Sequence, residues 1–254
     1  MPWLKADSPF DPDQLDTPVI GIGALLGNHD SGLHRHRCGQ LLFTQRGCTR
    51  ITLDHQVCML PPTQVAWIPP GVEHRAVMQQ TVDYRSVYLD QTLSRQLPDH
   101  VQVMSVSSLL RAVLESICEA PFKTDWHHGK PFHLLSLCLD EIAAAPAQPM
   151  LLPLPVDRRL SPLLENLEQL PPDLQTLVTR VGASDRTIGR IFRRETGMGY
   201  QQWRQQWRLL RAVELLATGR SLDCCADELG FASDSAFIAF FKGMTGCTPR
   251  GYFK

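Results

Sequence analysis

The last third of this chain carries one short pattern twice, and this repeat limits the possible folds more than any other feature. An apolar stripe with helical spacing runs through residues 173–181, and Gly182 and Ser184 follow it. Glycine adopts the left-handed conformation that ends a helix, and serine caps the start of the next helix. Gly230 and Ser233 repeat this order after a second apolar segment. The pattern therefore predicts two pairs of short helices, each pair joined by a tight turn.

The second helix of the first pair has an apolar stripe of Ile188, Ile191 and Phe192, and arginines occupy its free face. A short helix, a glycine turn and a second helix with free arginines are typical of a helix-turn-helix that binds DNA. Between the two pairs, residues 200–217 also have helical periodicity and would span roughly 27 Å at about 1.5 Å per residue. A helix of this length could place the two second helices near the roughly 34 Å that separates successive major-groove faces.

Residues 157–254 resemble the DNA-binding domain of the AraC/XylS family of bacterial regulators. The strings that carry this resemblance are SDRTIGRIFRRETGMGYQQWRQQWRLLRAVELL, ADELGFASDSAFIAFFK and GCTPRGYF. The resemblance implies seven helices, of which the third and the sixth enter adjacent major grooves. It also implies a transcription regulator, activator or repressor, that binds double-stranded DNA at a promoter or operator, with RNA polymerase as a further candidate partner.

The resemblance assigns base-facing positions on the third helix, which we name the first reader helix. These positions fall on Arg186, Gly189 and Arg190. Arginine is the best reader of guanine because it can bond to O6 and N7 together, whereas glycine can only let the backbone approach. The same helix carries Arg193 and Arg194, which we expect to be solvated or to contact phosphate.

On the sixth helix, named the second reader helix, the equivalent positions are Asp234, Ser235, Ala236 and Ala239. These small or acidic side chains cannot make a bidentate base contact beyond cytosine donors or thymine methyls. We therefore expect the first reader helix to supply most of the sequence discrimination. The second should dock mainly on phosphate through Ser233, Ser235 and Lys242. Ser184, which caps the first reader helix, completes the predicted DNA-binding set.

Length and charge divide the chain in two. A chain of 254 residues suits two domains, each large enough to bury its own core. Residues 157–254 contain 14 Lys and Arg against 11 Asp and Glu, whereas residues 1–156 contain 11 against 15 and all nine histidines. A basic excess suits a phosphate backbone. Residues 146–156 contain four prolines and predict a semi-rigid linker at the change in composition.

The N-terminal part has the pattern of a small antiparallel barrel or sandwich. Five short β-type segments, separated by turn residues, are VIGIGALLG, QLLFTQ, TRITLD, QVAWI and YRSVYL. Residues 103–118 and 132–145 have apolar residues at intervals of three and four, which predicts two amphipathic helices. Such a helical pair could pack on the barrel or on a second subunit.

Part of this region also resembles the cupin superfamily, through HRHRCGQ at 34–40, Gly47 and PPGVEH at 69–74. In cupins an HxH pair, a carboxylate and a later histidine meet inside the barrel to hold a divalent metal. The resemblance places these roles on His34, His36 and His74, with Gln40 where the family usually has glutamate. An amide oxygen is a neutral, weaker ligand, so the site could hold zinc, nickel, cobalt or iron or remain empty. Alternatively, the three are ordinary histidines in a barrel mouth.

The predicted fold class is α+β. It comprises a cupin-type effector- or metal-sensing β-barrel at 1–100, a helical pair for dimerisation at 101–145, a linker at 146–156 and an all-α domain with two helix-turn-helix units at 157–254. The expected function is a DNA-binding regulator that responds to a small molecule or metal in the barrel, and the expected assembly is a homodimer. No membrane segment or CxxC pair occurs, so we expect a cytoplasmic protein with mostly reduced cysteines.

Two other functions remain open at this stage. One is a cupin metalloenzyme, such as a dioxygenase, fused to a DNA-binding domain. Gln40 in place of a charged ligand and the lack of a recognisable acid-base pair argue against it, so we expect no enzyme activity and no catalytic residue. The other is a constitutive architectural DNA binder with a vestigial barrel. Metal content and effector-dependent DNA binding would separate the three.

Overall fold

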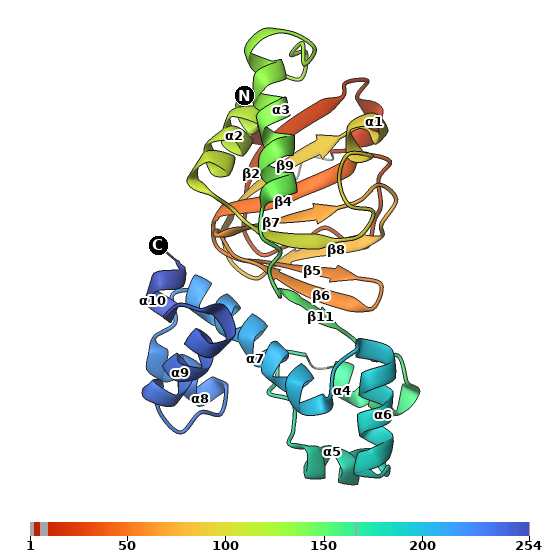
Figure 1. The fold of residues 1–254 in the computed structure, drawn as a ribbon, viewed down its shortest axis with the longest axis vertical. Helices are drawn as coiled ribbons and strands as arrows, with labels where there is room; N and C mark the ends of the chain where they lie inside the picture. The colour runs from red at the N-terminus through yellow and green to blue at the C-terminus, as the bar shows by residue number, and fades with distance from the viewer. Residues whose placement is uncertain (1–2, 6–9, 166, 254) are drawn as a thin grey trace. The chain divides into compact units, whose positions relative to one another are not determined.

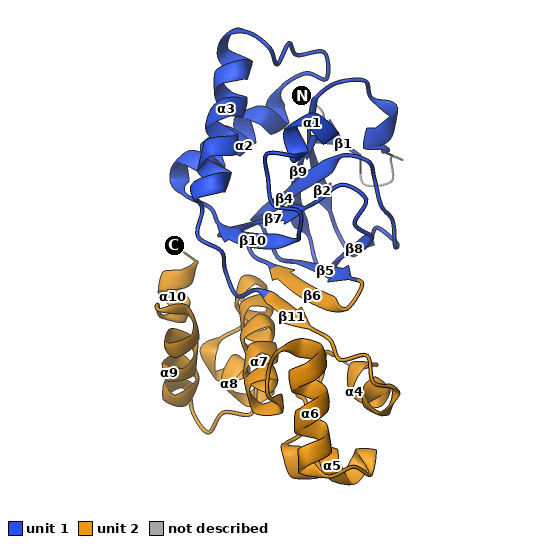
Figure 2. Ribbon diagram, turned by 45° about the vertical axis from the view of Figure 1, so that its right-hand side comes forward, with its two compact units in different colours: residues 1–53, 60–150 blue, residues 54–59, 151–254 orange. Residues whose placement is uncertain are grey.

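The chain forms two compact units, shown in different colours in Figure 2. The computed structural model describes residues 3–5, 10–165 and 167–253. Unit 1 comprises residues 1–53 and 60–150, and unit 2 comprises residues 54–59 and 151–254. The boundary after residue 150 falls inside the expected linker, and part of that linker is a strand, β11 (Leu151–Pro153), which pairs with β6 (Gln56–Leu60).

Unit 1 is built on a six-stranded sheet (Figure 1). Its strands, in spatial order, are β1 (Trp3–Leu4), β2 (Val19–Leu26), β9 (Val82–Leu89), β4 (Gly39–Arg46), β7 (Gln64–Ile68) and β10 (Gln102–Ser105). Neighbouring strands are antiparallel except β1 and β2, which are parallel. Most positions of β2, β4 and β7 are buried, as expected for strands that are covered on both faces.

A second set of antiparallel strands in unit 1 comprises β5 (Thr49–Leu53), β8 (His74–Met78) and β3 (His29–Asp30). Burial alternates along β5 and β8, so each of these strands has one face inside and one outside. The unit also contains two short helices, the 3-10 helix η1 (Pro12–Gln14) and α1 (Gln91–Ser94). The expected α+β class, with a strand-rich first part, is confirmed.

The predicted helical pair is present, but its first member starts later than expected. Residues 102–105 form strand β10 paired with β7, and α2 (Ser108–Glu119) starts after its capping residue Ser107. Val103 and Met104 are both buried in this strand, and a segment this short has no clear period, so periodicity misread it as helix. The second helix, α3 (Gly129–Ala144), begins three residues before the predicted start.

Helices α2 and α3 pack on the six-stranded sheet, which was the first of the two expected packing partners. Their apolar faces share one buried cluster with residues of β4, β7 and β9, including Leu114, Ile117, Phe43 and Trp67. Gly21 on β2 makes the approach possible, because a Cβ there would lie 2.3 Å from the carbonyl oxygen of Ile117. The opposite face of the sheet is left to line a cavity.

Unit 2 is helical after its short strand pair. Its elements are η2 (Arg158–Leu160), α4 (Ser161–Leu164), α5 (Leu174–Val181), α6 (Asp185–Thr196), α7 (Tyr200–Ala217), α8 (Leu222–Glu228), α9 (Asp234–Thr245) and α10 (Pro249–Tyr252). The described part of unit 2 thus contains seven α-helices, as the resemblance implied, and α6 and α9 are the third and the sixth. Helix α7 has the predicted bounds.

The predicted turn chemistry is confirmed in the first helix pair. Gly182 ends α5 with φ of 66°, and the Ser184 hydroxyl accepts a hydrogen bond from the Thr187 N–H at 3.3 Å. In the second pair Gly230 has φ of 68°, and Ser233 accepts from the Ala236 N–H at 3.3 Å. No helix in the described ranges is long and apolar enough to cross a bilayer.

Candidate functional site

Helix α6 presents four arginines on its exposed face. Arg186, Arg190, Arg193 and Arg194 are all exposed, whereas the opposite stripe of Ile188, Ile191 and Phe192 is buried. The buried stripe attaches the helix to unit 2, because Phe192 packs against Tyr200 and Trp203 at centroid distances of 4.9 and 5.4 Å. The fold therefore holds the predicted first reader helix with its cations toward solvent.

An open groove of about 890 Å³ lies along this face of α6. Its lining includes Arg186, Gly189 and Arg190 from the reader helix together with Gln201 and Gln202 from the first turn of α7. Sequence reasoning did not identify the two glutamines as site residues. Their position in the first turn of the predicted helix at 200–217 was the only signal, and it does not reveal which neighbouring helix they face.

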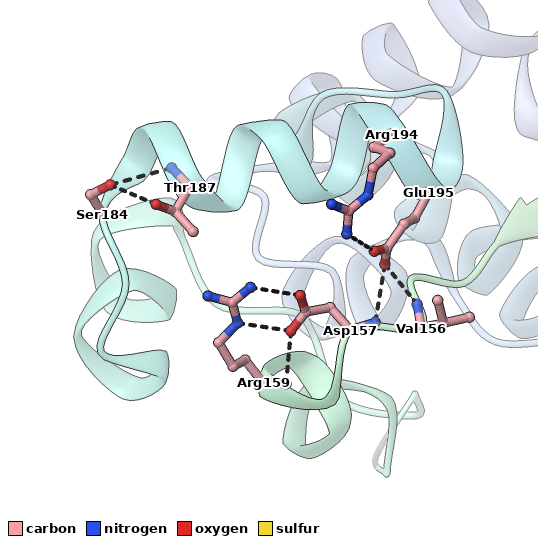
Figure 3. Close-up of polar contacts among 7 residues, drawn as sticks. All are labelled: Val156, Asp157, Arg159, Ser184, Thr187, Arg194 and Glu195. Atoms are coloured by element: carbon pink, nitrogen blue, oxygen red, sulfur yellow. Dashed lines mark hydrogen bonds and ion pairs between the residues drawn. The ribbon is translucent and has the colours of Figure 1, made fainter.

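The predicted DNA-binding residues of the first helix-turn-helix differ in their bonding partners. Within the described ranges, no carboxylate pairs with Arg186, Arg190 or Arg193, so these side chains keep their donors free. Arg194 instead donates to the carboxylate of Glu195. The Ser184 hydroxyl is engaged in the helix cap and also contacts the Thr187 hydroxyl at 3.0 Å (Figure 3).

Helix α9 presents a much less basic surface. Ser233, Ser235, Ala236, Ala239 and Lys242 are exposed, and Asp234 is half-buried. Lys242 is the single cation of this helix. The buried face is aromatic, since Phe237 and Phe241 are fully buried. The predicted positions of the second reader helix are therefore accessible, but they carry little positive charge.

Two arginines of α7 hold the second helix pair. The guanidinium of Arg208 lies 4.9 Å from the ring centre of Phe231, in the turn before α9. Arg211 donates to Glu228 of α8 at 2.9 Å and to Glu214 at 2.7 Å. The helix between the readers therefore bonds directly to the second helix-turn-helix, and neither arginine was a predicted site residue.

In unit 1 the three predicted histidines lie together. One ring nitrogen of each of His34, His36 and His74 lies within 4.8 Å of the others. His74 is on β8 and forms an isolated antiparallel bridge with His34. His36 and His74 are buried, and His34 is exposed. The local HxH pattern is thus completed by a strand almost forty residues further along the chain.

Each of these histidines turns its Nδ1 toward a backbone carbonyl. His34 Nδ1 lies 3.0 Å from the Gly32 oxygen, His36 Nδ1 lies 2.6 Å from the Cys38 oxygen and His74 Nδ1 lies 2.9 Å from the Val72 oxygen. A carbonyl can only accept, so each contact favours a proton on Nδ1, and at His34 and His74 this leaves the Nε2 lone pair free. This is the orientation that metal-binding histidines usually have.

The electrostatics at His74 favour a neutral ring. Burial lowers the pKa of His74 to about 4, so at neutral pH its ring is uncharged. Its Nε2 is buried and has no hydrogen-bond partner. A buried nitrogen lone pair without a partner is uncommon in folded proteins and indicates a place for a ligand or an ion.

Gln40 joins the cluster from β4. Its Oε1 lies 3.1 Å from His36 Nε2, and its Nε2 donates to the hydroxyls of Ser86 at 2.8 Å and Tyr84 at 3.0 Å. The Tyr88 hydroxyl lies 3.3 Å from the same nitrogen. The hydroxyls therefore orient the amide so that its oxygen faces the histidines.

The histidines lie in the wall of a cavity of about 530 Å³ between the two sets of strands. Apolar side chains of β2, β4 and β8 form much of the wall, and Tyr84 and Tyr88 extend from β9. The residues around η1, including Phe10 and Asp13, line it from the N-terminal segment. A cavity of this size, lined by both apolar side chains and convergent polar groups, is large enough for a small molecule.

Known families and proteins match both units. A family model described as a helix-turn-helix domain matches residues 177–254, and one described as an AraC-like ligand binding domain matches residues 18–148, more than half of the chain. The HTH-type transcriptional regulator NimR of Escherichia coli is 27% identical over 250 residues, which cover 96% of this chain and 90% of NimR.

Solved structures are also similar to this chain. ToxT of Vibrio cholerae matches with 9% identity and a TM-score of 0.37, over 93% of this chain and 98% of ToxT. The DNA-binding domain of AdpA, a global transcriptional factor solved with a target DNA, matches with 35% identity and a TM-score of 0.34, over 39% of this chain and 89% of that domain. From the two family matches and the paired helix-turn-helix units, this chain belongs to the AraC family of DNA-binding transcription regulators, with an AraC-like ligand binding domain.

Proposed function

We propose that this regulator reads its DNA site mainly through α6 and docks α9 mainly on phosphate. The contrast in exposed cations carries this proposal, because α6 presents four arginines and α9 presents Lys242 alone. A guanidinium can bond to O6 and N7 of guanine together, which neither Ser235 nor Ala239 can imitate. Serine hydroxyls can still donate to phosphate oxygens.

A duplex selected by the wild-type chain from a random-sequence pool provides the probe for this proposal. Arg190→Ala should weaken binding by about tenfold and relax the preference at one base pair. Lys242→Ala should weaken all sequences alike and reduce the salt slope by about one. Binding isotherms over a salt series and a set of single-base variants measure both effects. If Arg190→Ala weakened all sequences equally and Ser235→Ala changed the base preference, the assignment would be reversed.

We propose further that His34, His36 and His74 hold a divalent transition metal through their Nε2 atoms, with the Gln40 oxygen as a neutral fourth ligand. The unpartnered, buried Nε2 of His74 and the three Nδ1–carbonyl contacts support this donor set. Such an ion would supply a Lewis-acidic position for a donor atom of an effector. The protein's own part is to orient the rings and to surround them with the polar and apolar side chains of the cavity wall.

Metal content of protein purified without an affinity tag tests this site. We expect stoichiometric metal in the wild-type chain and none in His34→Ala/His36→Ala, with altered binding of the double variant to the selected duplex. A His55→Ala variant is the matched control, because His55 lies outside the cavity lining. Metal-free wild-type protein with unchanged DNA binding in the double variant would contradict the metal site and leave an organic effector as the signal.

We propose that the cavity of unit 1 is a sensing site and not an active site. The relatives that match both units are transcription regulators, and Asp13 and Asp30 in the cavity lining are ion-paired with Arg37 and Arg75, so neither is a free carboxylate base. Effector binding must favour one DNA-binding state, since a ligand bound equally by both states shifts nothing. Turnover of a substrate by the metal-loaded chain would favour the cupin-enzyme alternative.

We also propose that the chain forms a homodimer through α2 and α3. We further propose that it acts in the cytoplasm and that RNA polymerase is a partner at the promoter. Leu109 on α2 and Phe132 on α3 are large apolar side chains that are 49% and 45% exposed. Sedimentation of wild-type protein and a Leu109→Asp/Phe132→Asp variant tests the dimer. A monomeric wild-type chain at micromolar concentration would contradict it.

A further inference from the structure

The last residues of the linker are bonded to the first reader helix through one side chain. Glu195, in the last turn of α6, accepts the backbone N–H groups of Val156 and Asp157 on its Oε2, at 2.9 and 3.0 Å (Figure 3). Its Oε1 accepts from Arg194. The Glu195 side chain is only 11% exposed, although its donors Val156 and Arg194 are themselves exposed. Both carboxylate oxygens are therefore used, and two of the three donors belong to the linker end.

The residues at the linker end are also bonded to one another. The Asp157 carboxylate accepts from the Arg159 backbone N–H at 3.1 Å and from its guanidinium at 2.8 and 2.6 Å. Asp157 thereby caps η2 and fixes the direction of the chain immediately after the two N–H groups that Glu195 holds. Hydrogen bonds to a charged acceptor are roughly twice as strong as neutral ones. The segment at 156–159 is thus bonded to α6 at its first two residues and internally through Asp157 and Arg159.

The preceding residues are bonded to the helix that joins the two readers. The Trp203 indole N–H on α7 donates to the Pro153 carbonyl at 2.6 Å. The Leu154 N–H donates to the His55 carbonyl at 2.7 Å. Residues 153–157 are therefore held at Pro153 by α7, at Leu154 by His55 and at Val156 and Asp157 by Glu195 of the reader helix.

We propose that Glu195 is a positioning residue through which the linker sets the orientation of the first reader helix on DNA. Arg190 lies between one and two turns before Glu195 on the same helix, so a small tilt at the anchored end displaces the guanidinium from a base edge. A base contact depends on this alignment, whereas a phosphate contact from a flexible lysine does not. This inference rests on the proposal that α6 reads bases.

A double-mutant cycle in the full chain tests the proposal, with the selected duplex as probe. In the wild-type background, Arg190→Ala should weaken DNA binding about tenfold. When Glu195→Ala is also present, Arg190→Ala should weaken binding less than about threefold, because a misaligned guanidinium makes little base contact that its removal could abolish. Lys242→Ala should cost the same in both backgrounds. Glu195→Gln keeps an oxygen for the linker N–H groups but loses the charge, so it should restore part of the Arg190 effect.

Each outcome bears on one proposal or on both. If Arg190→Ala costs as much with Glu195→Ala as without it, Glu195 has no positioning role and the inference is overturned while the reader assignment stands. If Arg190→Ala costs nothing in the wild-type chain, both are overturned. Glu165→Ala is the matched control, because Glu165 is an exposed glutamate of the same unit. Thermal melts of each variant show whether a loss of DNA binding comes from unfolding. If Glu195→Ala does not fold, the double-mutant cycle is measured with Glu195→Gln in its place.

Discussion

Gln40 is the residue at which the cavity departs most clearly from the cupin pattern. Its amide oxygen faces His36 and its amide nitrogen is held by Ser86 and Tyr84. Hydroxyl groups can donate as well as accept, so the same neighbours could hold a carboxylate at this position. The surrounding residues therefore do not require an amide at position 40. With Gln40 the position offers a weaker metal ligand than glutamate would.

Gln40→Glu should accordingly raise the affinity of the cavity for a divalent metal by at least about tenfold, since an anionic ligand binds such ions more tightly than an amide. Competition between the protein and a chromophoric chelator measures the change. Gln96→Glu is a control at an exposed position outside the cavity lining. Equal affinities in wild-type and Gln40→Glu chains would mean that position 40 does not touch the ion.

The charge of Glu195 makes a pH-dependent contribution to stability. Partial burial raises the pKa of this carboxyl, but the hydrogen bond from Arg194 and the two backbone N–H bonds outweigh it, so its pKa is lowered. A lowered pKa means that the stabilisation is complete above the usual range of glutamate, about 4.3, and disappears as the pH falls through the lowered value.

We therefore expect wild-type protein to be more stable than Glu195→Gln at pH 7, and the difference to shrink below about pH 4. Denaturant titrations of both full-length proteins across this range measure it. Glu165→Gln should show no comparable trend. A constant difference between wild type and Glu195→Gln at all pH values would show that the charge is not what stabilises the linker end.

At the scale of elements, close packing of α2 on β2 depends on one glycine. A Cβ on Gly21 would lie 2.3 Å from the Ile117 carbonyl oxygen, which is backbone and cannot rotate away. By contrast, a Cβ on Gly243 in α9 would meet no atom within 4 Å. The two glycines thus serve as a matched pair in which the same substitution has opposite consequences.

Gly21→Ala should lower the free energy of unfolding by about 1–3 kcal/mol, because α2 must move off the sheet. Gly243→Ala should raise it by roughly 1 kcal/mol through helix propensity. Denaturant titrations with circular dichroism measure both. A neutral effect of Gly21→Ala would mean that α2 moves away from β2 at little cost.

At the scale of the whole molecule, the two units differ in what can stabilise them. The histidine cavity lies in unit 1, and both reader helices lie in unit 2. A ligand that binds only the folded state stabilises it by mass action, by about 2.7 kcal/mol at a hundred times its dissociation constant. Metal bound at the cavity should therefore raise the stability of the chain without touching a DNA-contacting residue.

Chelator-treated protein should consequently melt at a lower temperature than protein with zinc or nickel restored, and His34→Ala/His36→Ala should show no difference between the two conditions. Differential scanning calorimetry, which separates transitions of the two units where they unfold independently, measures this. An equal response of the double variant to metal would place the binding elsewhere in the chain.

The DNA-binding unit was largely predictable because its signals are local. Gly182, Ser184 and the apolar stripe of α6 lie within a few residues of one another, so the helices and turns could be identified before any packing was known. The HxH pair was predictable for the same reason. Strands β3, β8 and β10 were not, since short segments carry little periodic signal and pair with distant residues.

The sequence by itself determined the periodic helices, their caps, the cationic face of α6 and the three histidines that could meet. Only the tertiary structure decided that Nδ1 of each histidine faces a carbonyl, that residues 54–59 join the second unit and that Glu195 holds the linker. These features join residues 20 or more positions apart or depend on the exact path of the backbone. Sequence spacing reports neighbours along the chain, whereas such contacts exist only once the chain has folded.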